Sequence, residues 1–282
     1  MTDQRYVPFG SAPRPTTDAE IEARVRELLA RLAQRRARGL EKIVVTAHLD
    51  GADIASLKVD GTGVAVEVDG PAPERLAAVD VTHREPAVVR SLELVAHPAS
   101  VAGVPVDVAI AASDLRFAWA TSSENRLFLE VQPPSQDEPV VGTARVSAPR
   151  KGIDGAARAA LADALRSRGF TLTDLDLDLE SRGPRELSVR AEARVRKSVV
   201  RAAVVVTGVA SIDDALVLSV RDAEISSTNP IVGALVAPFR PRIAAVVART
   251  IDLAALLPAG VSVSDVSVVV GPDDVVVSAT LG

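Results

Sequence analysis

The sequence contains no cysteine and is poor in aromatic residues. Without cysteine, the 282-residue chain has no disulfide bonds, no thiolate metal ligands and no cysteine nucleophile. Phe, Trp and Tyr make up 2% of the residues, whereas hydrophobic residues in total make up 48%. Any core or pocket is therefore built from Ala, Val, Leu and Ile, and there is little aromatic surface for stacking on sugars or bases.

An excess of positive charge and a long apolar run are also missing. With 32 basic and 37 acidic residues the formal net charge is −5, and the arginines are spread along the chain, which argues against a nucleic-acid partner. The longest apolar runs, such as residues 231–239, have about half of the ~18 residues that a membrane-spanning helix needs. The polar N-terminal stretch does not resemble a secretory signal. We therefore expect a soluble protein, either cytoplasmic or peripheral at the inner face of a membrane.

Recognisable catalytic and metal-binding motifs are absent from the sequence. No G-x-S-x-G elbow or phosphate-binding loop occurs, and His48, His83 and His97 do not have the spacing of a zinc site. The stretch HLDGAD contains His48, Asp50 and Asp53, which could form an acid/base pair. A polar turn after the preceding strand explains the same residues more simply. We therefore expect no enzyme activity, no cofactor and no metal site.

The first helix is predicted by a capping pattern. Residues 1–16, rich in Pro, Gly, Ser and Thr, are expected to be a disordered lead-in. Thr17 and Glu20 then have the spacing of a capping box, and apolar residues recur at helical intervals until Gly39. This pattern predicts an amphipathic helix of roughly 20 residues.

Strands and two further helices are predicted downstream. Alternating Val-rich stretches between residues 42 and 131 are typical of strands. A second helix is expected over residues 155–168, with Asp154 as its N-cap and Gly169 at its end. A third is expected over residues 230–257, where two internal prolines should break or kink it.

The stretch DLDLDLE, residues 174–180, places a carboxylate at every second position. A calcium loop of the EF-hand type that starts at Asp174 would need Gly and Glu where the chain has Leu179 and Arg185. Instead, a spacing of two puts the aspartates on one face of a strand and the leucines on the other. We therefore interpret the aspartates as a solvated face, and the leucines as the face that covers something.

Four segments share a similar pattern, at residues 113–131, 173–191, 213–222 and 264–279, and in three of them two alternating strands flank a polar turn, as in a β-hairpin. Because the predicted strands come in consecutive runs, the sequence indicates an α+β fold with an antiparallel sheet. We expect a long, curved sheet with about three long helices. After the lead-in, residues 17–282 are expected to form one elongated domain or two halves, residues 17–147 and 148–282.

The C-terminal part resembles a known family. The segment from NPIVGALVAPFRPRIAAVVARTIDLAALLPAGVSVSDV to the closing hairpin is similar to the ending of the actinobacterial LmeA-like phospholipid-binding family. Upstream, LELVAHPASVAGVPVDVAIAASDLRFAW is similar to the middle of that family, so the likeness covers roughly residues 90–282. The family is itself similar to the tubular lipid-binding (TULIP-like) superfamily. The resemblance implies a curved sheet wrapped around long helices, an apolar groove for acyl chains, and a non-catalytic role in cell-envelope lipid metabolism.

Within such a fold we predict which residues would line the groove. The expected lining is a helical face opposed by the leucines of the alternating strand, namely Ile231, Leu235, Phe239, Ile243, Val246, Val247, Leu175, Leu177 and Leu179. Arg240 and Arg242 could meet a phosphate headgroup. The expected partners are a phospholipid or other acyl lipid and, transiently, a membrane surface. The alternative is a structural or scaffolding protein with a filled core that acts through protein–protein contacts.

Overall fold

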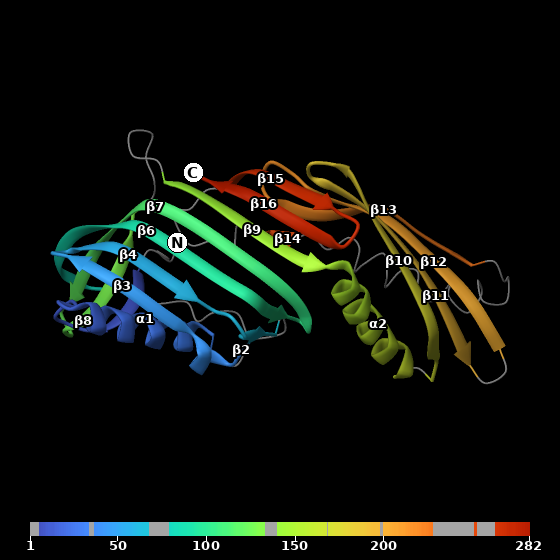
Figure 1. Ribbon diagram of the computed structural model, residues 1–282, viewed down its shortest axis with the longest axis horizontal. Coiled ribbons are helices and arrows are strands. Elements are labelled where there is room, and N and C mark those ends of the chain that lie inside the picture. Colours follow the sequence, from blue (N-terminus) through green and yellow to red (C-terminus); the bar gives the residue numbers. More distant parts are fainter. Residues whose placement is uncertain are drawn as a thin grey trace. The chain divides into compact units, whose positions relative to one another are not determined.

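The computed structural model describes residues 6–33, 37–67, 79–132, 140–167, 169–197, 200–227, 251–252 and 263–282 (Figure 1). The chain divides into two compact units. Unit 1 consists of Met1–Ser147, Leu257–Asp265 and Ser278–Gly282, and unit 2 of Ala148–Leu256 and Val266–Val277. Two large, mainly antiparallel sheets and two α-helices give the described part an α+β fold, as the sequence predicts.

The larger sheet has eleven strands, and its main path runs in the order β15-β16-β9-β7-β6-β4-β3. The strands of this path are β3 (Val44–Asp50), β4 (Asp53–Asp60), β6 (Val81–Val101), β7 (Val104–Ser122), β9 (Val141–Pro149), β15 (Val263–Val270) and β16 (Asp274–Leu281). The others are β1 (Tyr6–Ser11), β2 (Ala37–Arg38), β5 (Ala65–Val66) and β8 (Arg126–Val131). Most pairs are antiparallel, but β4 and β5 each pair with β6 in parallel.

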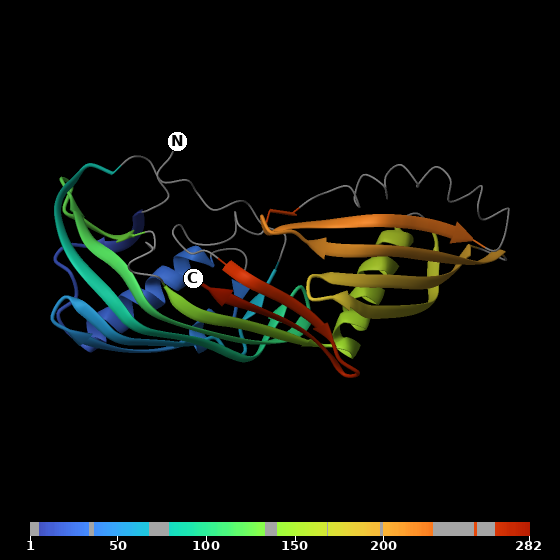
Figure 2. The ribbon, with the colours of Figure 1, turned by 90° about the horizontal axis from the view of Figure 1, so that it is seen from above.

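Helix α1 (Asp18–Leu32) begins where the capping pattern predicts. The Thr17 side chain accepts a hydrogen bond from the Glu20 backbone N–H at 3.3 Å, while the Glu20 carboxylate accepts from the Thr16 N–H at 2.8 Å. The helix ends at Leu32, earlier than the predicted end at Gly39, and residues 37–38 form β2 instead. Its apolar face packs on β3 (Figure 2).

The core of unit 1 is closely packed around Trp119. Phe9, Ile21, Trp119 and Leu127 are among its largest side chains and are almost completely buried. The Trp119 ring contacts Phe9 and Phe117, with ring centroids 5.5 and 4.9 Å away. Three of the seven aromatic residues of the chain thus lie in one hydrophobic cluster, which stabilises this unit.

The predicted disordered lead-in is wrong for residues 6–11, which form strand β1. This strand pairs with β8, more than 110 residues later in the sequence, and buries Phe9 in the core. Arg84 and Glu130 fix Tyr6 at its start: the Tyr6 hydroxyl donates to Glu130 at 3.0 Å and accepts from Arg84 at 2.8 Å. Composition alone does not reveal this strand, because its partner lies far away along the chain.

The five-stranded sheet of unit 2 is antiparallel throughout and has the order β10-β11-β12-β13-β14. Its strands are β10 (Thr171–Gly183), β11 (Glu186–Lys197), β12 (Val200–Ile212), β13 (Val217–Ser227) and β14 (Ile251–Asp252). Three of the predicted hairpins match observed strand pairs: β7 with β8, β10 with β11, and β15 with β16.

Helix α2 (Arg150–Arg166) lies along the edge strand β10 (Figure 1). It begins four residues before the predicted cap Asp154, because the chain enters the helix directly from β9, with Pro149 as N-cap. It ends at Arg166, two residues before the predicted end, and the predicted terminator Gly169 follows with a positive φ of 75°. Most of the third predicted helix lies outside the described residues, but residues 251–252 within it form β14 and not helix.

Candidate functional site

Along β10 and β11, the sheet of unit 2 has one charged face and one aliphatic face. Along β10 the aspartates 174, 176 and 178 alternate with Leu175, Leu177 and Leu179, so that the two sets point to opposite sides, as predicted. The register continues this separation across the sheet: Leu177 faces Ala191 of β11, and Ala191 faces Val206 of β12. The two faces are therefore set by the alternation within each strand and by the register between strands.

The aliphatic face extends over four strands. Members of this face are Leu175, Leu177 and Leu179 on β10, Val189, Ala191, Ala193 and Val195 on β11, Ala202, Val204, Val206, Ala210 and Ile212 on β12, and Leu218 and Val220 on β13. These members are all aliphatic, and the same face also carries Leu187 and two serines near its ends, Ser181 opposite Leu187 and Ser227 opposite Val204. Such a face suits an apolar ligand or an apolar packing partner.

The side chains of this face are only partly buried. Leu179 and Val195 are 8% and 9% exposed, and the other members are half-buried. No residue of α2 is buried. Unit 1 differs, because it contains side chains such as Trp119 and Leu127 with 2% and 1% exposure. Among the described residues, the aliphatic side chains of unit 2 are therefore packed less completely than those of unit 1.

The charged face carries ion pairs between β10, β11 and α2. Asp174 lies directly opposite Arg194, with 3.6 Å between its Oδ2 and the guanidinium, and Arg158 of α2 reaches the same carboxylate at 3.3 Å. Arg150 of α2 lies 3.6 Å from Asp178. In the part of the chain that the structure describes, no group of three or more His, Cys, Asp or Glu side chains could hold a metal ion. Asp174 and Asp178 thus pair with arginines, whereas Asp176 lies opposite Glu192 of β11.

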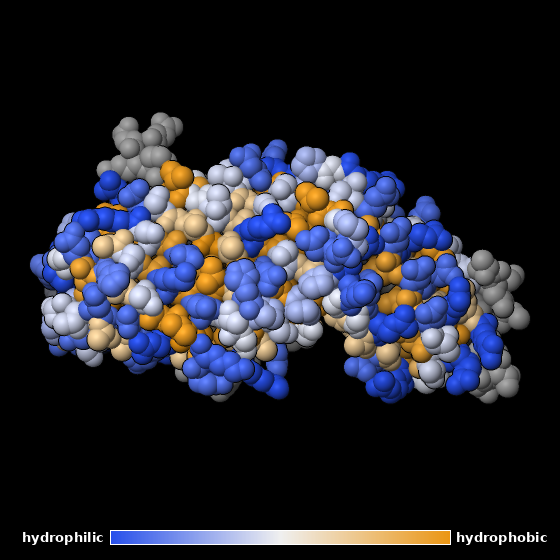
Figure 3. All heavy atoms as spheres, in the orientation of Figure 1, coloured by the Kyte–Doolittle hydropathy of each residue, from blue (hydrophilic) through white to orange (hydrophobic). Residues whose placement is uncertain are grey.

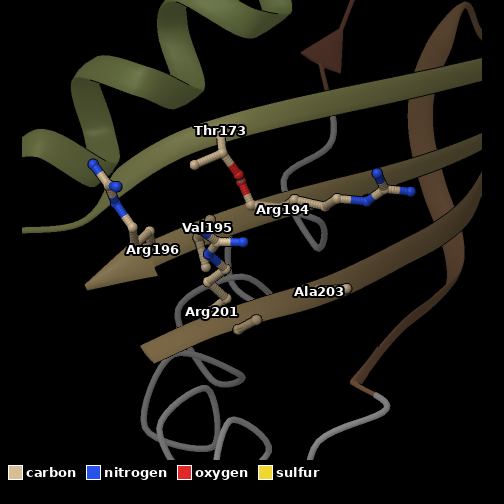
Figure 4. A pocket seen from close by; sticks show the side chains of 7 residues that line it. Thr173, Arg194, Val195, Arg196, Arg201 and Ala203 are labelled. Carbon is tan, nitrogen blue, oxygen red and sulfur yellow. Dashed lines mark hydrogen bonds between the residues drawn. The ribbon is translucent and has the colours of Figure 1, made fainter. Parts of the chain in front are cut away.

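A pocket of about 510 Å³ opens at the end of this sheet, where β11 turns into β12 (Figure 4). Its lining consists of Thr173, Arg194, Val195, Arg196, Arg201, Ala202 and Ala203. Thr173 lies at an irregularity in the β10–β11 register and donates its hydroxyl to the Arg194 carbonyl at 2.9 Å. Val195 and Ala202 belong to the aliphatic face, so three arginines and the edge of that face meet at one pocket.

The predicted groove residues are only partly covered by the structure. Leu175, Leu177 and Leu179 share the aliphatic face. The predicted helical lining (Ile231, Leu235, Phe239, Ile243, Val246 and Val247) and the predicted headgroup residues Arg240 and Arg242 lie outside the described residues.

Sequence reasoning missed the three pocket arginines. Their signal is the run VRAEARVRK, in which basic residues recur at every second position near the end of a strand. The run contains Arg194 and Arg196. The antiparallel pairing of β11 with β12 then places Arg201 of β12 opposite Arg196.

The alternative acid/base site at the HLDGAD turn is not assembled as a pair. His48 lies 3.0 Å from Asp18 of α1. Asp50 and Asp53 both pair with Arg90, at 2.9 and 2.8 Å, and these bonds raise the pKa of Arg90, with the Asp53 bond contributing most. His48 is therefore engaged by Asp18, whereas Asp50 and Asp53 share Arg90.

The surface of the protein mixes charged and apolar side chains, and Figure 3 shows both kinds side by side on the face drawn there. Among the described helices, neither is long and apolar enough to cross a membrane. Comparison of the chain with protein-family models, with curated proteins and with solved structures finds no match.

Proposed function

We propose that this protein binds amphiphilic molecules with acyl chains, such as phospholipids, and carries them without catalysing a reaction. The main support is the aliphatic face of unit 2, which spans four strands and whose side chains are half-buried. In this proposal the sheet wraps around helical segments and encloses a groove for the chain, and the protein contacts a membrane surface transiently while supporting cell-envelope lipid metabolism.

The energetics of acyl chains suit such a face. Moving a chain from water to an apolar surface is favourable by about 0.8 kcal/mol per buried CH₂, so a long chain gains on the order of 10 kcal/mol. Transfer from a bilayer gains almost nothing, because the chain already lies in an apolar medium. This near-balance lets a carrier both load and unload. Aliphatic side chains such as Val204 and Val206 also suit chains of different length and unsaturation.

The pocket at the β11–β12 turn supports an amphiphilic ligand over a purely apolar one. It combines Arg194, Arg196 and Arg201 with Val195 and Ala202, which lie at the edge of the aliphatic face. A polar headgroup and an acyl chain therefore find matching surfaces next to each other. The sequence resemblance to the LmeA-like phospholipid-binding family leads to the same expectation.

The first test asks whether lipid accompanies the protein. Native mass spectrometry and organic extraction of the purified protein should detect retained acyl lipid at close to one molecule per chain. Protein that is consistently empty and also fails to take up a fluorescent fatty acid would contradict lipid carriage, and would favour the scaffolding alternative.

A second test uses two matched double variants on one strand. Val204 and Val206 lie on the aliphatic face of β12, whereas Val205 and Val209 lie opposite Glu192 and Ser188 on the other face. Val→Thr keeps a β-branched side chain and preserves strand propensity, but it adds a hydroxyl. An unpaired hydroxyl that faces an apolar ligand costs about 1–3 kcal/mol. The double variant Val204→Thr and Val206→Thr should therefore bind fatty acid about tenfold or more weakly than the wild type.

The control double variant, Val205→Thr and Val209→Thr, should bind fatty acid as tightly as the wild type. Circular dichroism of both variants checks that the sheet is intact. Equal loss of binding in the two variants would show that the aliphatic face is not the binding surface.

A further inference from the structure

In the pocket at the β11–β12 turn, two of the arginines lie directly opposite each other on neighbouring strands. Arg196 of β11 lies opposite Arg201 of β12 in the antiparallel register. Directly opposed residues have Cβ atoms only about 4.5–5.5 Å apart, and like charges in such positions destabilise a sheet. Two cations at this spacing repel each other, and an anion bound between them would relieve that repulsion.

Among the residues that the structure describes, no carboxylate forms an ion pair with Arg196 or Arg201. Other arginines of unit 2 do have such partners: Arg158 pairs with Asp174, and Arg221 pairs with Glu186 at 2.6 Å. The third pocket arginine, Arg194, has only long contacts of 3.6 Å, to Asp174 and to Glu192 on its own strand.

The arginine side chains have room and freedom to rearrange around a ligand. Figure 4 shows Arg194 and Arg196 extending in opposite directions from β11, with Arg201 between them. All three are exposed, and the pocket that they line has a volume of about 510 Å³. Rotation of the long side chain of Arg196 about its staggered torsions can therefore bring its guanidinium to an anion held by Arg201.

We propose that Arg196 and Arg201, assisted by Arg194, bind a phosphate-type oxyanion. The planar guanidinium forms two parallel N–H···O bonds with one phosphate, and a tetrahedral phosphate has enough acceptor oxygens to serve two opposed guanidinium groups. Bound there, the anion neutralises the charge repulsion across the β11–β12 pair. The anion is either the phosphate headgroup of a lipid or free phosphate. If it is a lipid headgroup, the inference rests on the lipid binding proposed above; if it is free phosphate, it does not.

Calorimetric titration of the full chain at low salt tests the proposal with three ligands: inorganic phosphate, oleoyl lysophosphatidic acid, and monoolein, which has the same acyl chain without phosphate. If the anion is a headgroup, lysophosphatidic acid should bind about tenfold or more tightly than monoolein, because charge-assisted hydrogen bonds are strong. If the anion is free phosphate, inorganic phosphate should bind at least as tightly as lysophosphatidic acid.

The double variant Arg196→Gln and Arg201→Gln should lose the phosphate contribution in either case and leave monoolein binding unchanged. The matched control is Arg190→Gln, since Arg190 lies on the same strand and the same face but not in the pocket. It should bind like the wild type. Arg201→Glu is a second variant that turns the like-charge pair into an opposite-charge pair; it should keep the sheet folded and also abolish phosphate binding.

Two results would overturn the oxyanion site: a wild type that shows no preference for either phosphate ligand over monoolein, or Gln and Glu variants that bind phosphate as the wild type does. A wild type that binds phosphate but not monoolein would support the oxyanion site and count against acyl-chain binding. The two proposals can therefore fail separately.

Discussion

Asp18, in the first turn of α1, has a carboxylate oxygen 3.0 Å from Nδ1 of His48 on β3. Its other carboxylate oxygen accepts a hydrogen bond from the Leu49 backbone N–H at 2.8 Å. These two bonds tie the start of the helix to the sheet of unit 1. They lower the pKa of Asp18, mainly through the Leu49 N–H and secondly through the His48 side chain.

The lowered pKa predicts a pH-dependent contribution of Asp18 to stability. Because its folded-state pKa lies below the unfolded value of about 3.9, the contribution is present above about pH 4 and is lost as the pH falls through the folded-state pKa. Asp18→Asn should therefore have a lower Tm than the wild type near neutral pH, and this difference should shrink in acid. Thermal melts over a pH series measure it. A constant difference at all pH values would show that the charge of Asp18 is not involved.

Trp119 should be sensitive even to conservative substitution. Its indole N–H donates to the Ala52 carbonyl at 2.8 Å, and its side chain is 2% exposed. Trp119→Phe would leave that carbonyl without its donor and create a small cavity, so we expect a loss of about 1–3 kcal/mol in the free energy of unfolding. Because this is the single Trp, circular dichroism must follow unfolding. Leu32→Ala, at a 61% exposed position, is the control and should change stability little.

Gly142 should not tolerate a side chain. It lies on β9 opposite Ala112 of β7, and a Cβ there would be 2.6 Å from the Ala111 carbonyl oxygen and 3.0 Å from the Ala112 Cβ. Gly142→Ala therefore forces the two strands apart, and we expect a loss of about 1–3 kcal/mol, as for other overpacking substitutions. Urea unfolding measures it. A variant as stable as the wild type would mean that β9 can shift without cost.

Gly155 is predicted to give the opposite result. It is exposed inside α2, and a Cβ added there would meet no atom within 4 Å beyond the adjacent residues and backbone of its own helix. Gly155→Ala removes backbone freedom from the unfolded chain, so the same urea experiment should show a gain of roughly 0.5–1 kcal/mol. A destabilised variant would indicate that the glycine is needed for a contact of α2 that requires no side chain.

The sequence alone predicted those features that depend on neighbours along the chain. The two-residue period of residues 174–180 predicted a strand with leucines on one face, because side chains alternate in any extended chain. The Thr17–Glu20 spacing predicted where α1 starts, because a helix N-terminus needs side-chain acceptors within one turn. Hairpins such as β10–β11 follow from the same local rules.

Only the tertiary structure decided which distant segments meet. Tyr6–Ser11 reads as a polar lead-in until β8 supplies its hydrogen-bond partner and the core accepts Phe9. Likewise, a periodic arginine such as Arg196 is ordinary in one strand, and becomes a candidate anion ligand only when the register sets Arg201 opposite it. The physical reason is that strand pairing and burial depend on contacts between residues far apart in the sequence, whereas periodicity and capping report only on adjacent turns and strands.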